Sequence, residues 1–222
     1  MTLTASPHTS YQDRAGQEVP GRRAGISLTA IRGTRPKDWL LRLGANEEAV
    51  HASVPYREFM PCPSLDPDSV GMLGACGEWT YVLEGELAAT WFLAQFDNLA
   101  VVPNEEEELV CVTLNHHHAP GTLAYSAPGI HGVWMAEFGR GFLEDLSVAP
   151  PDASGMLASF DEALARAGAV YERLGPQRPW QDMCDTEWAT AIYRAIGDHF
   201  DFTVNRGDVE EGLLPAVALP LP

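Results

Sequence analysis

The chain has 222 residues, 45% of them hydrophobic, and a formal net charge of −17 from 14 basic and 31 acidic residues. This length and composition suffice for a folded domain with a sizeable core and exclude a disordered chain. The negative charge disfavours nucleic acid as a partner because it repels phosphate, and no apolar run approaches the ~20 residues that a membrane span requires.

Three parts are expected along the chain. Residues 1–23 are polar and lack the basic and apolar regions of a secretory signal, which predicts a mobile N-terminal arm. Residues 24–212 are predicted to form a single domain. Residues 213–222 form a Pro-rich apolar tail that either packs on the body or docks on a second copy as a homodimer. The four cysteines form no C-x-x-C pair, which favours free thiols and a cytoplasmic location.

The first half of the domain is predicted to alternate between strands and helices. Residues 25–33 indicate a half-buried strand at or next to a sheet edge, and residues 34–44 a helix with Pro36 in its first turn. Residues 46–68 hold four prolines and predict a long connection without a regular element, and residues 69–76 predict a short helix. Strands are then expected at 78–84 and 99–102, on either side of a helix at 87–96.

The second half predicts a three-stranded meander followed by two helices. The meander strands are expected at 107–115, 122–126 and 132–138, separated by Pro- and Gly-containing turns, and the helices at 157–174 and 186–200. This order favours an α+β fold with one mixed or mainly antiparallel sheet, packed by helices that include the two at the C-terminus.

Two short motifs resemble an actinobacterial family of domains of unknown function. One is a strand followed by Arg32-Gly33 and a Pro-containing helix ending Arg-Leu-Gly-Ala at residues 42–45. The other is a Gly-x-Trp-Thr-x-x-x-Glu strand at residues 77–84. The similarity covers about residues 24–140. It implies an α+β fold and cytoplasmic residence, and it implies no reaction or catalytic residue.

The run His116-His117-His118 in the first meander turn is the clearest local candidate for chemistry. His116 and His118 point to the same side of an extended chain, so they are weak candidates for two metal ligands or for proton transfer. His131 would lie at the other end of the meander strand, roughly 16 Å away at 3.3 Å per residue, and so cannot complete such a site. A solvated turn is the expected outcome, and no metal or other cofactor is predicted.

Glutamates supply the remaining candidates. Glu84 and Glu137 lie on strands rich in aromatic residues, where an inward carboxyl would have a raised pKa and could act as a general acid; an outward position is the expectation for each. Residues 105–108 are four consecutive glutamates, expected as a solvated loop, with a docking surface for a basic partner as the functional alternative.

The sequence contains no nucleotide-binding, serine-hydrolase or zincin motif. Together with the acidic charge and the apolar tail, this favours an acidic cytoplasmic module that binds a protein partner, of a regulatory or toxin-neutralising kind. The alternative is a small-molecule enzyme or ligand-binding protein of specialised metabolism, with His116, His118, Glu84 and Glu137 as acid–base groups around a pocket between sheet and helices.

Overall fold

The computed structural model describes residues 27–52, 54–59, 70–84, 102–113, 122–129, 132–137, 154–169 and 186–219. The strands are β1 Ser27–Arg32, β2 Val70–Cys76, β3 Trp79–Glu84, β4 Glu108–Thr113, β5 Thr122–Ser126, β6 Trp134–Glu137 and β7 Ala216–Ala218. The helices are α1 Pro36–Arg42, α2 Glu47–Ala52, α3 Tyr56–Phe59, α5 Ser154–Arg166, α6 Thr186–Phe200 and α7 Arg206–Glu210.

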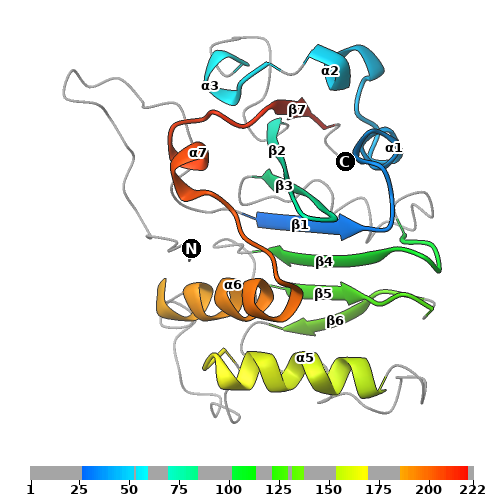
Figure 1. The fold of residues 1–222 in the computed structure, drawn as a ribbon, viewed down its shortest axis with the longest axis vertical. Helices are drawn as coiled ribbons and strands as arrows, with labels where there is room; N and C mark the ends of the chain where they lie inside the picture. The colour runs from blue at the N-terminus through cyan, green and yellow to red at the C-terminus, as the bar shows by residue number, and fades with distance from the viewer. Residues whose placement is uncertain are drawn as a thin grey trace.

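One seven-stranded sheet organises the fold, in the order β6-β5-β4-β1-β3-β2-β7 (Figure 1). Every strand pairing is antiparallel, which confirms the α+β class. The predicted meander is β4-β5-β6. The first strand, expected at or next to an edge, instead lies in the centre between β3 and β4. Its polar positions, Ser27 and Thr29, are therefore buried as well as its apolar ones.

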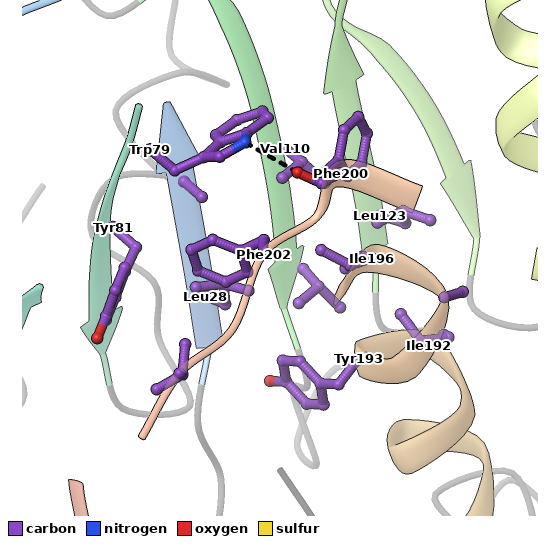
Figure 2. Packing of buried hydrophobic residues seen from close by; sticks show 14 of the residues in the cluster. Leu28, Trp79, Tyr81, Val110, Leu123, Ile192, Tyr193, Ile196, Phe200 and Phe202 are labelled. Carbon is purple, nitrogen blue, oxygen red and sulfur yellow. Dashed lines mark hydrogen bonds between the residues drawn. The ribbon is translucent and has the colours of Figure 1, made fainter. Parts of the chain in front are cut away.

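Helices α5 and α6 cover one face of the sheet, here called the first face. Its core includes alternate residues of β3, Trp79, Tyr81 and Leu83, and Phe160 of α5. Figure 2 shows Trp79 and Tyr81 beside Phe200 of α6 and Phe202 of the segment after it. The Trp79 indole Nε1–H donates to the carbonyl oxygen of Phe200 at 3.2 Å. The Phe160 and Phe200 rings meet edge to face at 5.0 Å between centroids. These contacts make a closely packed sheet–helix interface.

Helix α1 packs on the opposite, second face of the sheet. Trp39, Leu40 and Leu43 of α1 and the turn after it are buried there against Ile31 of β1 and Val82 of β3. The predicted Pro36 does lie in the first turn of this helix. Because α1 follows β1 directly, it covers the end of the second face at which β1 finishes.

The helix expected at residues 69–76 is wrong, because this segment forms strand β2. β2 and β3 make a hairpin in which Cys76 pairs with Trp79 across a turn that Gly77 enters with φ 59°. Gly74 belongs in this strand because a Cβ there would overlap the ring of Tyr81 on β3. Packing against the neighbouring strand therefore outweighs the weak strand propensity of glycine.

Two other segments differ from the structure expected for them. Residues 46–68 are not wholly irregular, since α2 and α3 lie within them. Helix α5 ends at Arg166 and not near residue 174, because Gly168 adopts φ 76° and the Ala169 N–H bonds back to the carbonyl oxygen of Leu164 at 2.8 Å. Helix α6 has the bounds expected for it.

The C-terminal segment packs on its own chain, the first of the two alternatives that the sequence left open. Strand β7 pairs with β2, and the Tyr56 N–H of α3 donates to the carbonyl oxygen of Leu214 at 2.9 Å. Val217 and Leu219 are buried in the second-face core. The segment is thus part of the sheet and not an appended tail.

Several predictions lie outside the described residues and stay predictions. These are the mobile arm, the helix at 87–96, most of the strand at 99–102, the histidine turn and His131.

Candidate functional site

Glu84 lies inside the protein, contrary to the outward position expected for it. It ends β3 on the second face, in alternation with Trp79, Tyr81 and Leu83, which face α5 and α6. Only 2% of Glu84 is exposed. The structure therefore satisfies the geometric condition for an acid–base role at this residue.

Three further residues lie near Glu84 on the same face, and the four together are called the Glu84 cluster: Ser27, Thr29, Glu84 and Cys111. Ser27 is the cross-strand partner of Glu84, and Thr29 is the partner of Cys111. The Thr29 Oγ1 and Cys111 Sγ atoms lie 3.1 Å apart. All four residues are buried.

Cys111 is not a nucleophile in this cluster. Burial raises the pKa of its thiol to about 12, against a smaller lowering by the Thr29 hydrogen bond and a further rise from the nearby Glu84 charge. A thiol with this pKa stays protonated at neutral pH, and thiolate is the reactive form. The acid–base and hydrogen-bonding capacity of the cluster therefore rests on Glu84 and the two hydroxyls.

The sheet does not bring Glu84 and Glu137 together. Glu137 pairs with Thr122 at the end of β6, and its side chain lies outside the described part of the structure. Strands β1, β4 and β5 lie between β3 and β6. At about 4.8 Å per strand the two backbone positions are roughly 19 Å apart, too far for a carboxylate pair to share one reacting group.

His116 and His118 lie outside the described residues, so their metal-binding and proton-transfer roles stay untested. Among the residues that the structure does describe, no three His, Cys, Asp or Glu side chains are grouped so as to hold a metal ion. Cys76 and Cys111 are both free thiols.

A second polar cluster, which the sequence analysis did not identify, lies on the first face. Tyr125 Oη donates to Glu108 Oε1 at 2.6 Å, and Arg32 of the neighbouring strand pairs with the same carboxylate. The Arg32 guanidinium lies 5.0 Å from the centre of the Trp79 ring. Burial raises the pKa of Tyr125 well above its ordinary value, and its hydrogen bond to Glu108 raises it further. Because Arg32, Glu108 and Tyr125 lie on three different strands, only the register of the sheet reveals them.

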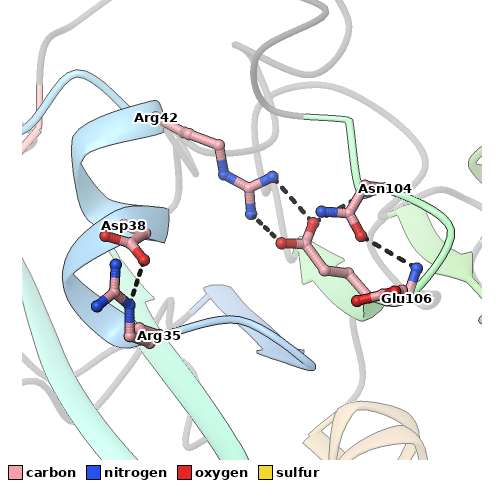
Figure 3. A network of polar contacts seen from close by, with 6 residues as sticks. Arg35, Asp38, Arg42, Asn104 and Glu106 are labelled. Carbon is pink, nitrogen blue, oxygen red and sulfur yellow. Dashed lines mark hydrogen bonds and ion pairs between the residues drawn. The ribbon is translucent and has the colours of Figure 1, made fainter.

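Two of the four glutamates at 105–108 are buried, contrary to the expectation of a wholly solvated loop. Glu107 accepts two hydrogen bonds from Arg42 of α1, at 2.9 and 2.8 Å, and one from the backbone N–H of Asn104 at 3.0 Å (Figure 3). Burial alone would raise the pKa of the Glu107 carboxyl, but these hydrogen bonds and the Arg42 charge hold it below its ordinary value. Glu107 and Glu108 thus neutralise two arginines of the same chain.

Glu105 and Glu106 are the exposed half of the run. The Asn104 side chain accepts from the Glu106 N–H at 3.0 Å, and the Gly129 N–H donates to the Glu105 carbonyl oxygen at 2.7 Å. Gly33 adopts φ 86° and passes so close to the Glu106 carbonyl that a Cβ would clash with it. These contacts hold the turn firmly, and both residues are exposed.

The stability of the folded protein should decrease as the pH drops below about 6.5, partly because of His199 on α6. Burial lowers the pKa of His199, with Glu108 raising it and Arg166 lowering it further. The unfolded chain then binds a proton at a pH where the folded protein does not, so stability is lost as pH falls through the unfolded value near 6.5. Melting temperatures between pH 7.5 and 5.5 should therefore decline less in His199→Gln than in the wild type. Equal declines would contradict this assignment.

Comparisons with protein-family models, with curated proteins and with solved structures found no match to this chain. The resemblance to the actinobacterial family therefore stays a prediction. In the described part of the chain, no helix has the length and apolar character of a membrane span.

Proposed function

We propose that this protein acts by binding a basic protein partner in the cytoplasm, in a regulatory or toxin-neutralising role. The observation that carries the proposal is the turn at Glu105 and Glu106, where two exposed carboxylates are held on a firmly anchored backbone. A fixed turn loses little conformational freedom when a partner binds, which favours affinity.

The charge of the whole chain supports the same proposal. A net charge of −17 attracts a cationic partner and accelerates its encounter with the protein. On the first face, where the alternative function would need a pocket between sheet and helices, the Phe160 ring packs against Tyr125 and Phe200, with 5.4 and 5.0 Å between ring centroids. Such packing is typical of a structural core.

A crosslinking experiment tests this function. A photoreactive amino acid is introduced at position 105 in the producing cells and crosslinked there. One dominant protein adduct should form, and it should be absent when the same amino acid replaces Glu162 on α5. The captured partner, once purified, should bind the double variant Glu105→Gln/Glu106→Gln about tenfold more weakly than it binds the wild type. A tenfold loss of affinity corresponds to about 1.4 kcal/mol of binding free energy, and each of the two rim charges contributes a fraction of that amount.

The matched control is Glu162→Gln/Asp198→Asn, which removes the same number of negative charges from exposed positions of α5 and α6. Its affinity for the partner should stay within about twofold of the wild type. Equal weakening by the two double variants would show that only overall charge matters, and the absence of a position-specific adduct would refute a docking role for this turn.

A second candidate function is a small-molecule enzyme or ligand-binding protein. The observation that favours it is the inward position of Glu84 beside two hydroxyl-bearing residues, since buried carboxyl groups commonly serve as acids, bases or ligand anchors.

A further inference from the structure

Ser27 has a buried hydroxyl group that makes no hydrogen bond within the described part of the structure. The residue is 0% exposed, and its Oγ has no hydrogen-bond partner in the part of the chain that the structure describes. Buried hydroxyl groups in proteins are nearly always hydrogen-bonded, and an exception calls for an explanation. A small bound molecule is one such explanation.

The position of Ser27 within the sheet identifies its surroundings. It lies directly opposite Glu84 on β3, and such cross-strand pairs have Cβ atoms about 5 Å apart on the same face. Thr29 and Cys111 occupy the next positions on this face toward α1. One small group can therefore contact the Ser27 hydroxyl and the Glu84 carboxylate together.

The second face changes character along its length. Toward the end of β1 it is apolar, where Ile31 and Val82 pack against α1. Toward the start of β1 the register aligns Glu84 and Ser27 with Thr113, Thr122 and Glu137 in one row across five strands, all of them residues of polar type. A polar ligand would suit this end of the face better than an apolar one.

We propose that Ser27 and Glu84 form a binding site for a small molecule that carries a protonated amine. This site deepens the second candidate function and rests on it; it is independent of the turn at Glu105 and Glu106.

The chemistry of the two side chains selects this class of ligand. An ammonium group has three donors, which suit a carboxylate oxygen and a hydroxyl oxygen at the same time. A carboxylate offers about four acceptor positions, so Glu84 can accept from a ligand in addition to its contact within the protein. The negative net charge of the chain favours a cation over an anion.

Nuclear magnetic resonance titration of the full chain with ethanolamine hydrochloride tests the site. Ethanolamine should cause saturable shifts of the Ser27 and Glu84 backbone amides. Ethylene glycol, which has a hydroxyl in place of the amine, and an equal concentration of sodium chloride should cause none. Shifts that rise linearly and match those from sodium chloride would show general cation screening by an acidic protein, and would overturn the proposal.

Three variants complete the test. Glu84→Gln keeps the shape of the side chain and should weaken ethanolamine binding at least tenfold, and Ser27→Ala should weaken it severalfold while the circular dichroism spectrum stays native. Glu162→Gln, on the exposed surface of α5, should bind as the wild type. Unchanged binding in Ser27→Ala would overturn the proposal even if Glu84→Gln does not fold. Neither Glu84→Gln nor Ser27→Ala should alter crosslinking from position 105, so failure of this site and failure of the partner-binding function are distinguishable.

Discussion

Replacing Arg42 with methionine should lower the free energy of unfolding by about 3 kcal/mol, because it leaves the Glu107 carboxylate buried without its cation. The Glu107 side chain is 2% exposed and that of Arg42 is 26% exposed, so water replaces little of the lost interaction. Methionine keeps the apolar packing of the arginine stem. Urea unfolding of both proteins, with the slope m compared, gives the difference.

Arg35→Met is the matched control at the other end of the same helix. Arg35 pairs with Asp38 at 2.6 Å, but its side chain is 83% exposed, so its loss should cost less than about 1 kcal/mol. A double-mutant cycle of Arg42→Met with Glu107→Gln separates the ion pair from the effect of Arg42 on the helix terminus. Equal costs for Arg42→Met and Arg35→Met would refute a structural role for the buried pair.

Deleting residues 213–222 should lower the free energy of unfolding by about 3–6 kcal/mol. The deletion removes β7, exposes the edge of β2, and withdraws Val217 and Leu219 from the core, each worth roughly 1.5–3 kcal/mol of burial. The total free energy of unfolding of a folded domain is about 5–15 kcal/mol, so the truncated chain should be marginally stable and prone to aggregate. Thermal unfolding and light scattering measure both effects.

Two leucines of this segment provide the internal control. Leu219→Ala, at a side chain 3% exposed, should cost about 2–5 kcal/mol. Leu213→Ala, at a residue 37% exposed, should cost under about 1 kcal/mol. If the truncated chain keeps the melting temperature and solubility of the full chain, or if the two substitutions are equivalent, the segment contributes nothing to the fold.

Much of the fold could be predicted because the signals are local. Residues 122–126 and 186–200 form the strand and helix expected of them, with the same bounds, because their apolar residues repeat at the periods of two and 3.6 that these structures require. β2 could not be predicted in this way. Gly71 and Gly74 weaken its strand propensity, and it is a strand because β3 and β7 pair with it on both sides.

The candidate site was likewise predictable only in part. The sequence identified Glu84 as a candidate but expected it to face outward, because alternation along one strand does not say which face is covered. The outcome depended on β1 lying in the centre of the sheet, which places Ser27 opposite Glu84. The grouping of Arg32, Glu108 and Tyr125 was not identified, since residues from three strands meet only after the register is set.

The sequence by itself determined that this chain is an acidic α+β protein, since composition, charge and hydrophobic period are properties of the chain alone. The tertiary structure alone decided which of four identical glutamates at 105–108 face solvent. Glu107 and Glu108 are buried because Arg42 and Arg32 come within reach when α1 and β1 pack beside them, whereas Glu105 and Glu106 are exposed. Burial of a charge depends on its neighbours in space, and those neighbours are far away in the sequence.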